Sequence, residues 1–93
     1  MSAKQVRWRL RCEGRVQQVG FRYTAYYLAR RLGLTGWVRN NTDGSVLMEA
    51  QGEAAKLRQF LIRLKSQPQI HIAKAVIEEI SPLPGERQFR VSG

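Results

Sequence analysis

The sequence predicts an α+β fold in which two helices cover one face of a four-stranded antiparallel sheet. Three observations support this prediction. Apolar residues alternate with period two near the N-terminus, they recur at helical spacing in residues 21–32 and 57–64, and an Asp-Gly turn at residues 43–44 joins two short extended runs. The resulting order, strand–helix–strand–strand–helix–strand (βαββαβ), is typical of the ferredoxin-like α/β sandwich.

Hydrophobic periodicity predicts the first strand and the first helix. In the strand, apolar residues alternate with basic ones, as expected for one buried and one solvated face. The apolar set is Val6, Trp8, Leu10 and Cys12, and the basic set is Arg7, Arg9 and Arg11. After a glycine-containing segment, apolar residues recur every three or four positions, at Phe21, Ala25, Leu28, Ala29 and Leu32. Gly33 is predicted to end this helix in a left-handed cap.

The middle of the chain is predicted to form a β-hairpin followed by a helix. Residues 36–40 are the second predicted strand and residues 45–51 the third, and the turn between them carries the Asp-Gly dipeptide. We predict that the second helix begins at residues 52–53 and ends before Pro68. Its apolar stripe consists of Leu57, Phe60, Leu61 and Leu64.

We predict the fourth strand over residues 70–80, and residues 88–91 could form a short additional strand at the C-terminus. Apolar residues occur at both odd and even positions of the fourth strand, so the pattern does not determine which of its residues face the core. Right-handed crossovers give the strand order 4-1-3-2, which makes the first and second strands parallel. We therefore expect the loop after Cys12 and residue Asn40 to lie at one end of the molecule, about 10 Å apart.

Length, charge and cysteine content limit the classes of function. The 93 residues predict one domain over residues 1–93. The net charge of +9 attracts anions, which include phosphorylated metabolites, nucleic acid and acidic membrane surfaces. No apolar run approaches the roughly 18 residues of a membrane helix, and no secretory signal follows the N-terminus, so we expect no membrane partner and a cytoplasmic location. A lone cysteine excludes an internal disulfide and a cysteine-based zinc site.

The segment from Gly14 to Arg22 has the composition of an anion-binding loop. It joins a strand to a helix N-terminus and contains two glycines, so several backbone N–H groups can point toward one anion. Arg22 adds a planar guanidinium that matches phosphate oxygens. Asn40 precedes a turn, where asparagine is common, but its side chain can also orient a water molecule. The residues alone leave both interpretations of Asn40 open.

Two segments of the chain resemble the signatures of the acylphosphatase family, small stand-alone acylphosphate phosphohydrolases. Residues 14–22, GRVQQVGFR, are similar to the loop signature G-x-V-Q-G-V-x-F-R. Residues 36–40, GWVRN, followed by Gly44 and Gly52, are similar to the second signature. Both occur in the family's order and separation, and the likeness extends from about Gln5 to Val91.

The resemblance implies an acylphosphatase, which hydrolyses the carboxyl–phosphate anhydride of acyl phosphates, without a metal or a cofactor. It implies that Arg22 binds the substrate phosphate and that Asn40 positions the attacking water. Backbone N–H groups of the phosphate-binding loop would complete the site, from Arg15, Val16, Gln17, Gln18, Val19, Gly20 and Phe21. Inorganic phosphate is then expected as product and inhibitor, and the protein is expected to be a monomer.

Two residues depart from the family pattern. Gln18 occupies a loop position where the family usually has glycine, and Cys12 occupies a position that is usually aliphatic. If Gln18 keeps a negative φ, the loop keeps its anion-binding conformation and activity is retained; if φ must be positive, at a free-energy cost of roughly 1 kcal/mol, the loop is strained or rebuilt and the enzyme is weakened. We expect activity to be retained. We interpret Cys12 as a buried thiol, and His71 as a structural or surface residue.

Two other classes of function compete with the enzyme. A nucleic-acid-binding module of this topology stacks bases on aromatic residues of the central strands. The corresponding exposed positions here carry Arg7, Arg9 and Arg11, so specific nucleic-acid recognition by this face is disfavoured. A regulatory small-molecule-binding domain has the same topology, but it would not require both Arg22 and Asn40.

Overall fold

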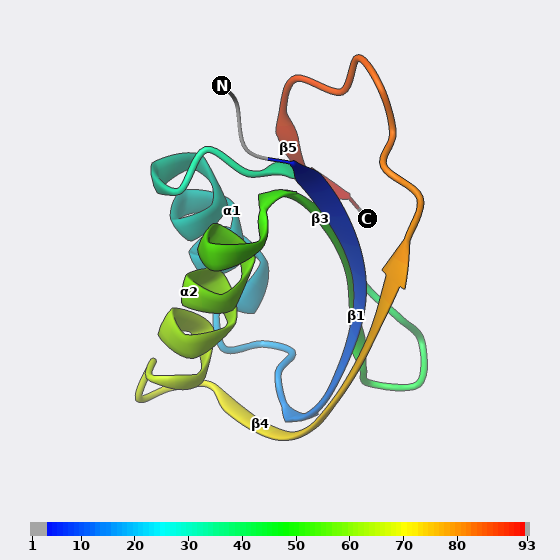
Figure 1. The fold of residues 1–93 in the computed structure, drawn as a ribbon. Coiled ribbons are helices and arrows are strands. Elements are labelled where there is room, and N and C mark those ends of the chain that lie inside the picture. The colour runs from blue at the N-terminus through cyan, green and yellow to red at the C-terminus, as the bar shows by residue number, and fades with distance from the viewer. Residues whose placement is uncertain (1–3, 93) are drawn as a thin grey trace.

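The computed structural model describes residues 4–92, which form five strands and two helices. The elements are β1 (Gln5–Arg15), α1 (Phe21–Arg31), β2 (Thr35–Asn40), β3 (Val46–Glu53), α2 (Ala54–Lys65), β4 (His71–Ile80) and β5 (Phe89–Ser92). Both helices pack on the same face of one curved sheet, and the opposite face carries no helix (Figure 1). The predicted two-layer α+β architecture is confirmed.

The sheet has the order β4-β1-β3-β2-β5, so the predicted order 4-1-3-2 is confirmed, with one strand added beside β2. The first four strands pair antiparallel, as predicted. The added strand, β5, runs parallel to β2, with Gly36 opposite Phe89 and Val38 opposite Val91. The long connection after β4 carries the chain across the sheet to this edge (Figure 1).

The pairing of β3 with both β1 and β2 determines which residues share a row. Val46 lies opposite Cys12 on β1 and opposite Asn40 on β2. The C-terminal part of β1 and the end of β2 therefore lie at the same edge of the sheet, two strand spacings apart. The prediction that the loop after Cys12 and Asn40 share one end of the molecule is confirmed.

The core fills the space between the helices and one face of the sheet. Its completely buried side chains include Leu10, Met48 and Val38 from one row of the sheet, Ala25 and Ala29 from α1, and Leu57, Phe60 and Leu64 from α2. Burial of each large apolar side chain stabilises the fold by about 1.5–3 kcal/mol. Cys12 is completely buried in this core, and burial raises the pKa of its thiol to about 11, as expected for a structural cysteine.

Two details differ from the predicted elements. The second helix begins at Ala54 rather than at Gly52, because β3 continues through Gly52 and Glu53, which pair with Val6 and Gln5 of β1. In β4, one extra residue, Ala73, lies opposite the step from Glu13 to Gly14 of β1, and this bulge changes the pairing register. Ile77 and Ala75 therefore share a face with Leu10 and Cys12, whereas Ile72 takes that face beyond the bulge. This shift explains why apolar residues occur on both parities.

The helix-free face of the sheet carries a network of ion pairs centred on Arg7. This side chain is 2% exposed, and it donates hydrogen bonds from Nε to Glu49 (2.9 Å) and from Nη1 to Gln51 (3.1 Å) and Glu86 (2.7 Å). Burial alone would raise the pKa of Glu49, but hydrogen bonds from Arg9 and Arg7 lower it below its ordinary value. The three basic residues of β1 are thus paired with carboxylates.

None of the helices within residues 4–92 has the length and apolar character to cross a membrane.

The bulge at Gly14 generates the first prediction, because this position excludes a Cβ atom. The φ angle of Gly14 is +123°, and an added Cβ would lie 2.4 Å from the carbonyl oxygen of His71. We expect Gly14→Ala to lower the free energy of unfolding by at least about 2 kcal/mol, measured by urea denaturation. Gly33→Ala is the matched control, since Gly33 also has a positive φ (+69°) but faces open space. Equal losses in the two variants would show that backbone strain, and not the close approach to β4, governs this position.

Candidate active site

The loop between β1 and α1 is anchored at both ends in the core. Arg15 ends β1 with an exposed side chain, whereas Val16 and Phe21 are only 1% and 2% exposed. Val19 is half-buried and packs against the same core. The loop therefore presents backbone to the surface while its apolar side chains point inward, which restricts the conformations that it can adopt.

The side chain of Gln17 ties this loop to the β2–β3 hairpin. Its amide nitrogen donates to the carbonyl oxygens of Asn41 (2.7 Å) and Ser45 (2.9 Å). The two acceptors lie on opposite sides of the hairpin turn, and Asn41 directly follows Asn40. The sequence pattern indicated only that the backbone N–H of Gln17 could bind phosphate. It did not predict that the Gln17 side chain would link the loop to the hairpin.

The hairpin turn is itself held by a compact set of hydrogen bonds. Asn41 Nδ2 donates to Ser45 Oγ (3.0 Å), and Ser45 donates from N and Oγ to Asp43 Oδ1 (3.0 and 2.6 Å). Arg11 of β1 forms an ion pair with Asp43 of the turn. Hydrogen bonds from Ser45 and Arg11 hold the pKa of Asp43 well below its ordinary value, so this carboxylate stays ionised. These contacts fix the end of β2, and thereby Asn40.

Two residues with left-handed backbone, Gln18 and Gly20, shape the exposed part of the loop. Gln18 has a φ of +62° and is the one residue other than glycine with a positive φ among residues 4–92. Gly20, at the N-cap of α1, has a φ of +77°. The left-handed alternative considered for Gln18 is therefore the one that the structure adopts, with a strain of roughly 1 kcal/mol.

The N-terminus of α1 is open to an anion. Gly20 makes no side-chain cap, and the first turn of the helix contains no acidic residue. The first intrahelical bond joins the Thr24 amide to the Gly20 carbonyl (3.0 Å), so the amides before Thr24 have no acceptor within the helix. Unsatisfied amides at the positive end of a helix dipole favour a bound phosphate.

Arg22 and Asn40 line the same small cavity. The cavity has a volume of about 160 Å³ and is lined by Val16, Gln18, Gly20, Phe21, Arg22, Tyr23 and Asn40. Arg22 is half-exposed, and its Nη1 donates to the carbonyl of Ser92 at the end of β5 (3.4 Å). The Oδ1 atom of Asn40 is buried and accepts no hydrogen bond from any described residue. A buried oxygen without a donor is destabilising by about 1–3 kcal/mol unless a ligand or water supplies one.

Six of the nine residues predicted for the site line this cavity. Arg15, Gln17 and Val19 do not: Arg15 lies at the exposed end of β1, and the side chains of the other two point to the hairpin and to the core. Tyr23 lines the cavity and was not predicted. It follows the loop signature directly, but nothing in the pattern distinguishes it from an ordinary exposed helix residue.

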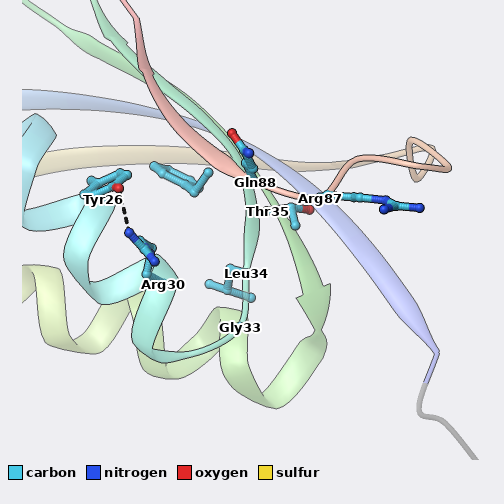
Figure 2. Close-up of a pocket in the computed structure, with 8 residues that line it drawn as sticks. Tyr26, Arg30, Gly33, Leu34, Thr35, Arg87 and Gln88 are labelled. Carbon is cyan, nitrogen blue, oxygen red and sulfur yellow. Dashed lines mark hydrogen bonds between the residues drawn. The ribbon is translucent and has the colours of Figure 1, made fainter.

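The described residues contain no cluster of three or more His, Cys, Asp or Glu side chains suited to a metal ion. A larger cavity, of about 380 Å³, lies at the other end of α1 (Figure 2). It is lined by Tyr26, Arg30, Leu34, Thr35, Gln88 and Phe89 among others, and includes no residue predicted for the site. Within it, Arg30 Nη1 donates to the Tyr26 hydroxyl (2.9 Å), and the Arg87 side chain extends away from this pair.

Comparison with known proteins identifies the family. The acylphosphatase family model matches residues 8–91. An acylphosphatase of Geobacillus thermodenitrificans is 44% identical over 80 residues, covering 85% of each chain, and one of Bacillus licheniformis is 40% identical over 88 residues, covering 94% of this chain and 98% of the relative. The crystal structure of acylphosphatase from Bacillus subtilis superposes with a TM-score of 0.88 at 32% identity, covering 95% of this chain and 99% of that one. This chain therefore belongs to the acylphosphatase family.

Proposed function

We propose that this chain is an acylphosphatase that hydrolyses the carboxyl–phosphate bond of small acyl phosphates to a carboxylate and inorganic phosphate. Family membership and the close structural likeness support this activity. The observation that carries the mechanism is the cavity between α1 and β2, which combines the Arg22 guanidinium, the open helix N-terminus and the unpartnered Oδ1 of Asn40. We also propose that residues 1–93 act as one acylphosphatase-like domain and as a monomer.

In the proposed reaction, the phosphate binds to Arg22 and to backbone N–H groups at the start of α1. Asn40 Oδ1 accepts a hydrogen bond from a water molecule, which attacks phosphorus. The bond between phosphorus and the carboxylate oxygen breaks, the carboxylate leaves with the electron pair, and a phosphate oxygen of the substrate takes the proton of the water. Since the carboxylate is a good leaving group, positioning and charge stabilisation supply the catalysis without a strong base.

Chelation tests the proposed chemistry most directly. We expect the purified protein to hydrolyse a simple acyl phosphate at an unchanged rate after exhaustive treatment with EDTA, since the residues proposed for the site include no carboxylate, histidine or thiol ligand. Inorganic phosphate should inhibit competitively, because the product occupies the same cradle. Activity that disappears on chelation and returns with a divalent ion would contradict the metal-free mechanism.

Replacement of Arg22 should remove phosphate binding and turnover together. We expect Arg22→Ala to lose competitive inhibition by inorganic phosphate, and Arg22→Lys to restore it poorly, because an ammonium cannot replace the planar fork. Arg39→Ala is the matched control: Arg39 precedes Asn40 on β2, but its guanidinium lies over the Trp37 ring (5.3 Å) and outside the cavity. Near-normal inhibition of Arg22→Ala by inorganic phosphate would show that Arg22 does not bind phosphate.

Replacement of Asn40 should separate turnover from binding. If Oδ1 orients the attacking water, Asn40→Ala should lower kcat by about 10²-fold or more while inhibition by inorganic phosphate stays close to normal. The same variant removes a buried oxygen without a partner, so its folding stability should not fall in proportion to the lost activity. A variant that folds and turns over at the parent rate would exclude Asn40 from catalysis.

Gln18 tests whether the left-handed loop conformation limits the enzyme. Gln18→Gly relieves the strain at φ +62°, and Gln18→Ala removes the side chain but keeps the strain. We expect kcat/KM of both variants to stay within about tenfold of the parent, equivalent to about 1.4 kcal/mol, because the loop already holds the cradle conformation. A gain of several hundredfold in Gln18→Gly alone would show that the parent loop is impaired.

A further inference from the structure

The two layers of the molecule differ sharply in charge. Helices α1 and α2 together contain seven of the 16 Lys and Arg residues of the chain and none of its seven Asp and Glu residues. In both helices, the first turn carries no acid and the last turn is basic. The net charge of +9 is therefore not spread evenly, and the helix layer forms the cationic side of the protein.

Most of the acidic residues pair with arginines of the sheet. The ion pairs within residues 4–92 join Arg7, Arg9 or Arg11 of β1 to a carboxylate of the sheet or of a loop. Five of the seven carboxylates are thus paired with arginines of β1, and the two others are Glu53, at the N-cap of α2, and Glu79 of β4. A surface with several exposed arginines and no carboxylates within its helices attracts polyanions, and this attraction weakens with salt.

Exposed aromatic rings lie among these arginines on α1. Tyr23 and Tyr27, four residues apart, are 61% and 63% exposed. The Tyr27 ring is held by an edge contact with Tyr26 (5.2 Å between centroids, 74° between planes). Tyr26 in turn packs beneath the Arg30 guanidinium, 5.6 Å from the ring centroid, and accepts its hydrogen bond (Figure 2). Tyr27 is therefore an exposed ring with one edge contact to a neighbouring aromatic residue.

A depression beside Tyr27 completes this surface. It has a volume of about 400 Å³ and is lined by Thr24, Tyr27, Leu28, Arg30, Arg31 and Gln67, so it lies where α1 meets the end of α2. None of these residues lines the cavity that contains Arg22 and Asn40. An aromatic ring bordered by two guanidinium groups matches the stacked base and adjacent phosphates of a nucleic-acid strand.

We propose that the outer side of the helix layer, which we call the helix face and define by Tyr27, Arg30, Arg31, Arg58 and Arg63, binds single-stranded nucleic acid without sequence preference. The arginines contact the phosphate backbone, and Tyr27 stacks against a base. The sequence-based argument against nucleic-acid recognition concerned Arg7, Arg9 and Arg11 on the open face of the sheet, which are paired with carboxylates. The helix face differs because its arginines and Tyr27 are exposed.

Single-stranded nucleic acid fits this surface better than an anionic membrane. Insertion into lipid requires several exposed apolar side chains on one face. Among the described residues of α1 and α2, Ile62 is the one large aliphatic residue that is mostly exposed (65%), and the exposed rings are tyrosines. Stacking uses the π-face of tyrosine, which every base can cover.

The test measures binding of a fluorescent, unphosphorylated oligonucleotide of about 20 nucleotides by anisotropy. We expect binding at about 50 mM salt, and an affinity at least tenfold lower at about 200 mM salt. Arg31→Gln combined with Arg63→Gln should weaken binding at least fivefold and lower the salt slope by about 2. Lys4→Gln combined with Lys74→Gln, which removes two exposed charges outside the helix face, is the matched control and should change affinity less than twofold.

Two further variants separate stacking from charge and the helix face from the catalytic cavity. Tyr27→Ala should weaken binding about fivefold or more, and Tyr27→Phe should restore it. Arg22→Ala should still bind the oligonucleotide within about threefold of the parent, although it loses inhibition by inorganic phosphate. Acyl phosphate hydrolysis by the Arg31/Arg63 and Tyr27 variants reports that they are folded.

Four results would overturn the proposal: no binding at low salt, equal weakening in the control pair, loss of binding in Arg22→Ala, or no effect of Tyr27→Ala. Binding to phosphatidylserine vesicles but not to the oligonucleotide would assign the helix face to a membrane surface and would also overturn it. Each of these results leaves the hydrolase activity untouched, so the proposal fails or survives independently of the proposed enzyme.

Discussion

The candidate site depends on the position of β3 between β1 and β2. Its antiparallel pairing places Val46 opposite Cys12 on one side and opposite Asn40 on the other. The chain can thus leave β1, form a loop and begin α1 at the same edge where β2 ends. A shift of β3 by one residue would move its buried side chains to the wrong face, so the core that specifies this register also specifies the site.

The register alone does not hold the loop, and side-chain contacts supply the remaining restraint. Val16 and Phe21 anchor the loop in the core, and Gln17 fastens it to both sides of the hairpin turn. On the far face, the buried Arg7 binds Glu86 in the connection to β5. That connection delivers Ser92, whose carbonyl accepts a hydrogen bond from Arg22. The ion network and the site are therefore linked through β5, although they lie on opposite faces of the sheet.

Periodicity in the sequence was sufficient to predict the layers, the order of four strands and the shared edge, because these follow from burial of one face of each element. It was insufficient where a local contact overrides the period. The bulge at Gly14 exchanges the parity of β4, and Gly52 remains in β3 because Val6 pairs with it. The parallel pairing of β5 and the cross-link from Gln17 depend on residues far apart in sequence, which no local pattern encodes.

The left-handed conformation of Gln18 is held by contacts within the protein. A strain of roughly 1 kcal/mol is small against the 5–15 kcal/mol that stabilise a typical domain, but it is enough to favour another loop conformation if the loop were unrestrained. The restraints lie immediately around it: Val16 and Gln17 precede Gln18, and Val19 and Phe21 follow it, all in contact with the core or the hairpin. Because these contacts are all made by the protein's own side chains, they hold the backbone of the loop in this conformation. The strain at Gln18 is thus offset by folding rather than by substrate binding, which leaves the interactions with phosphate available for the reaction itself.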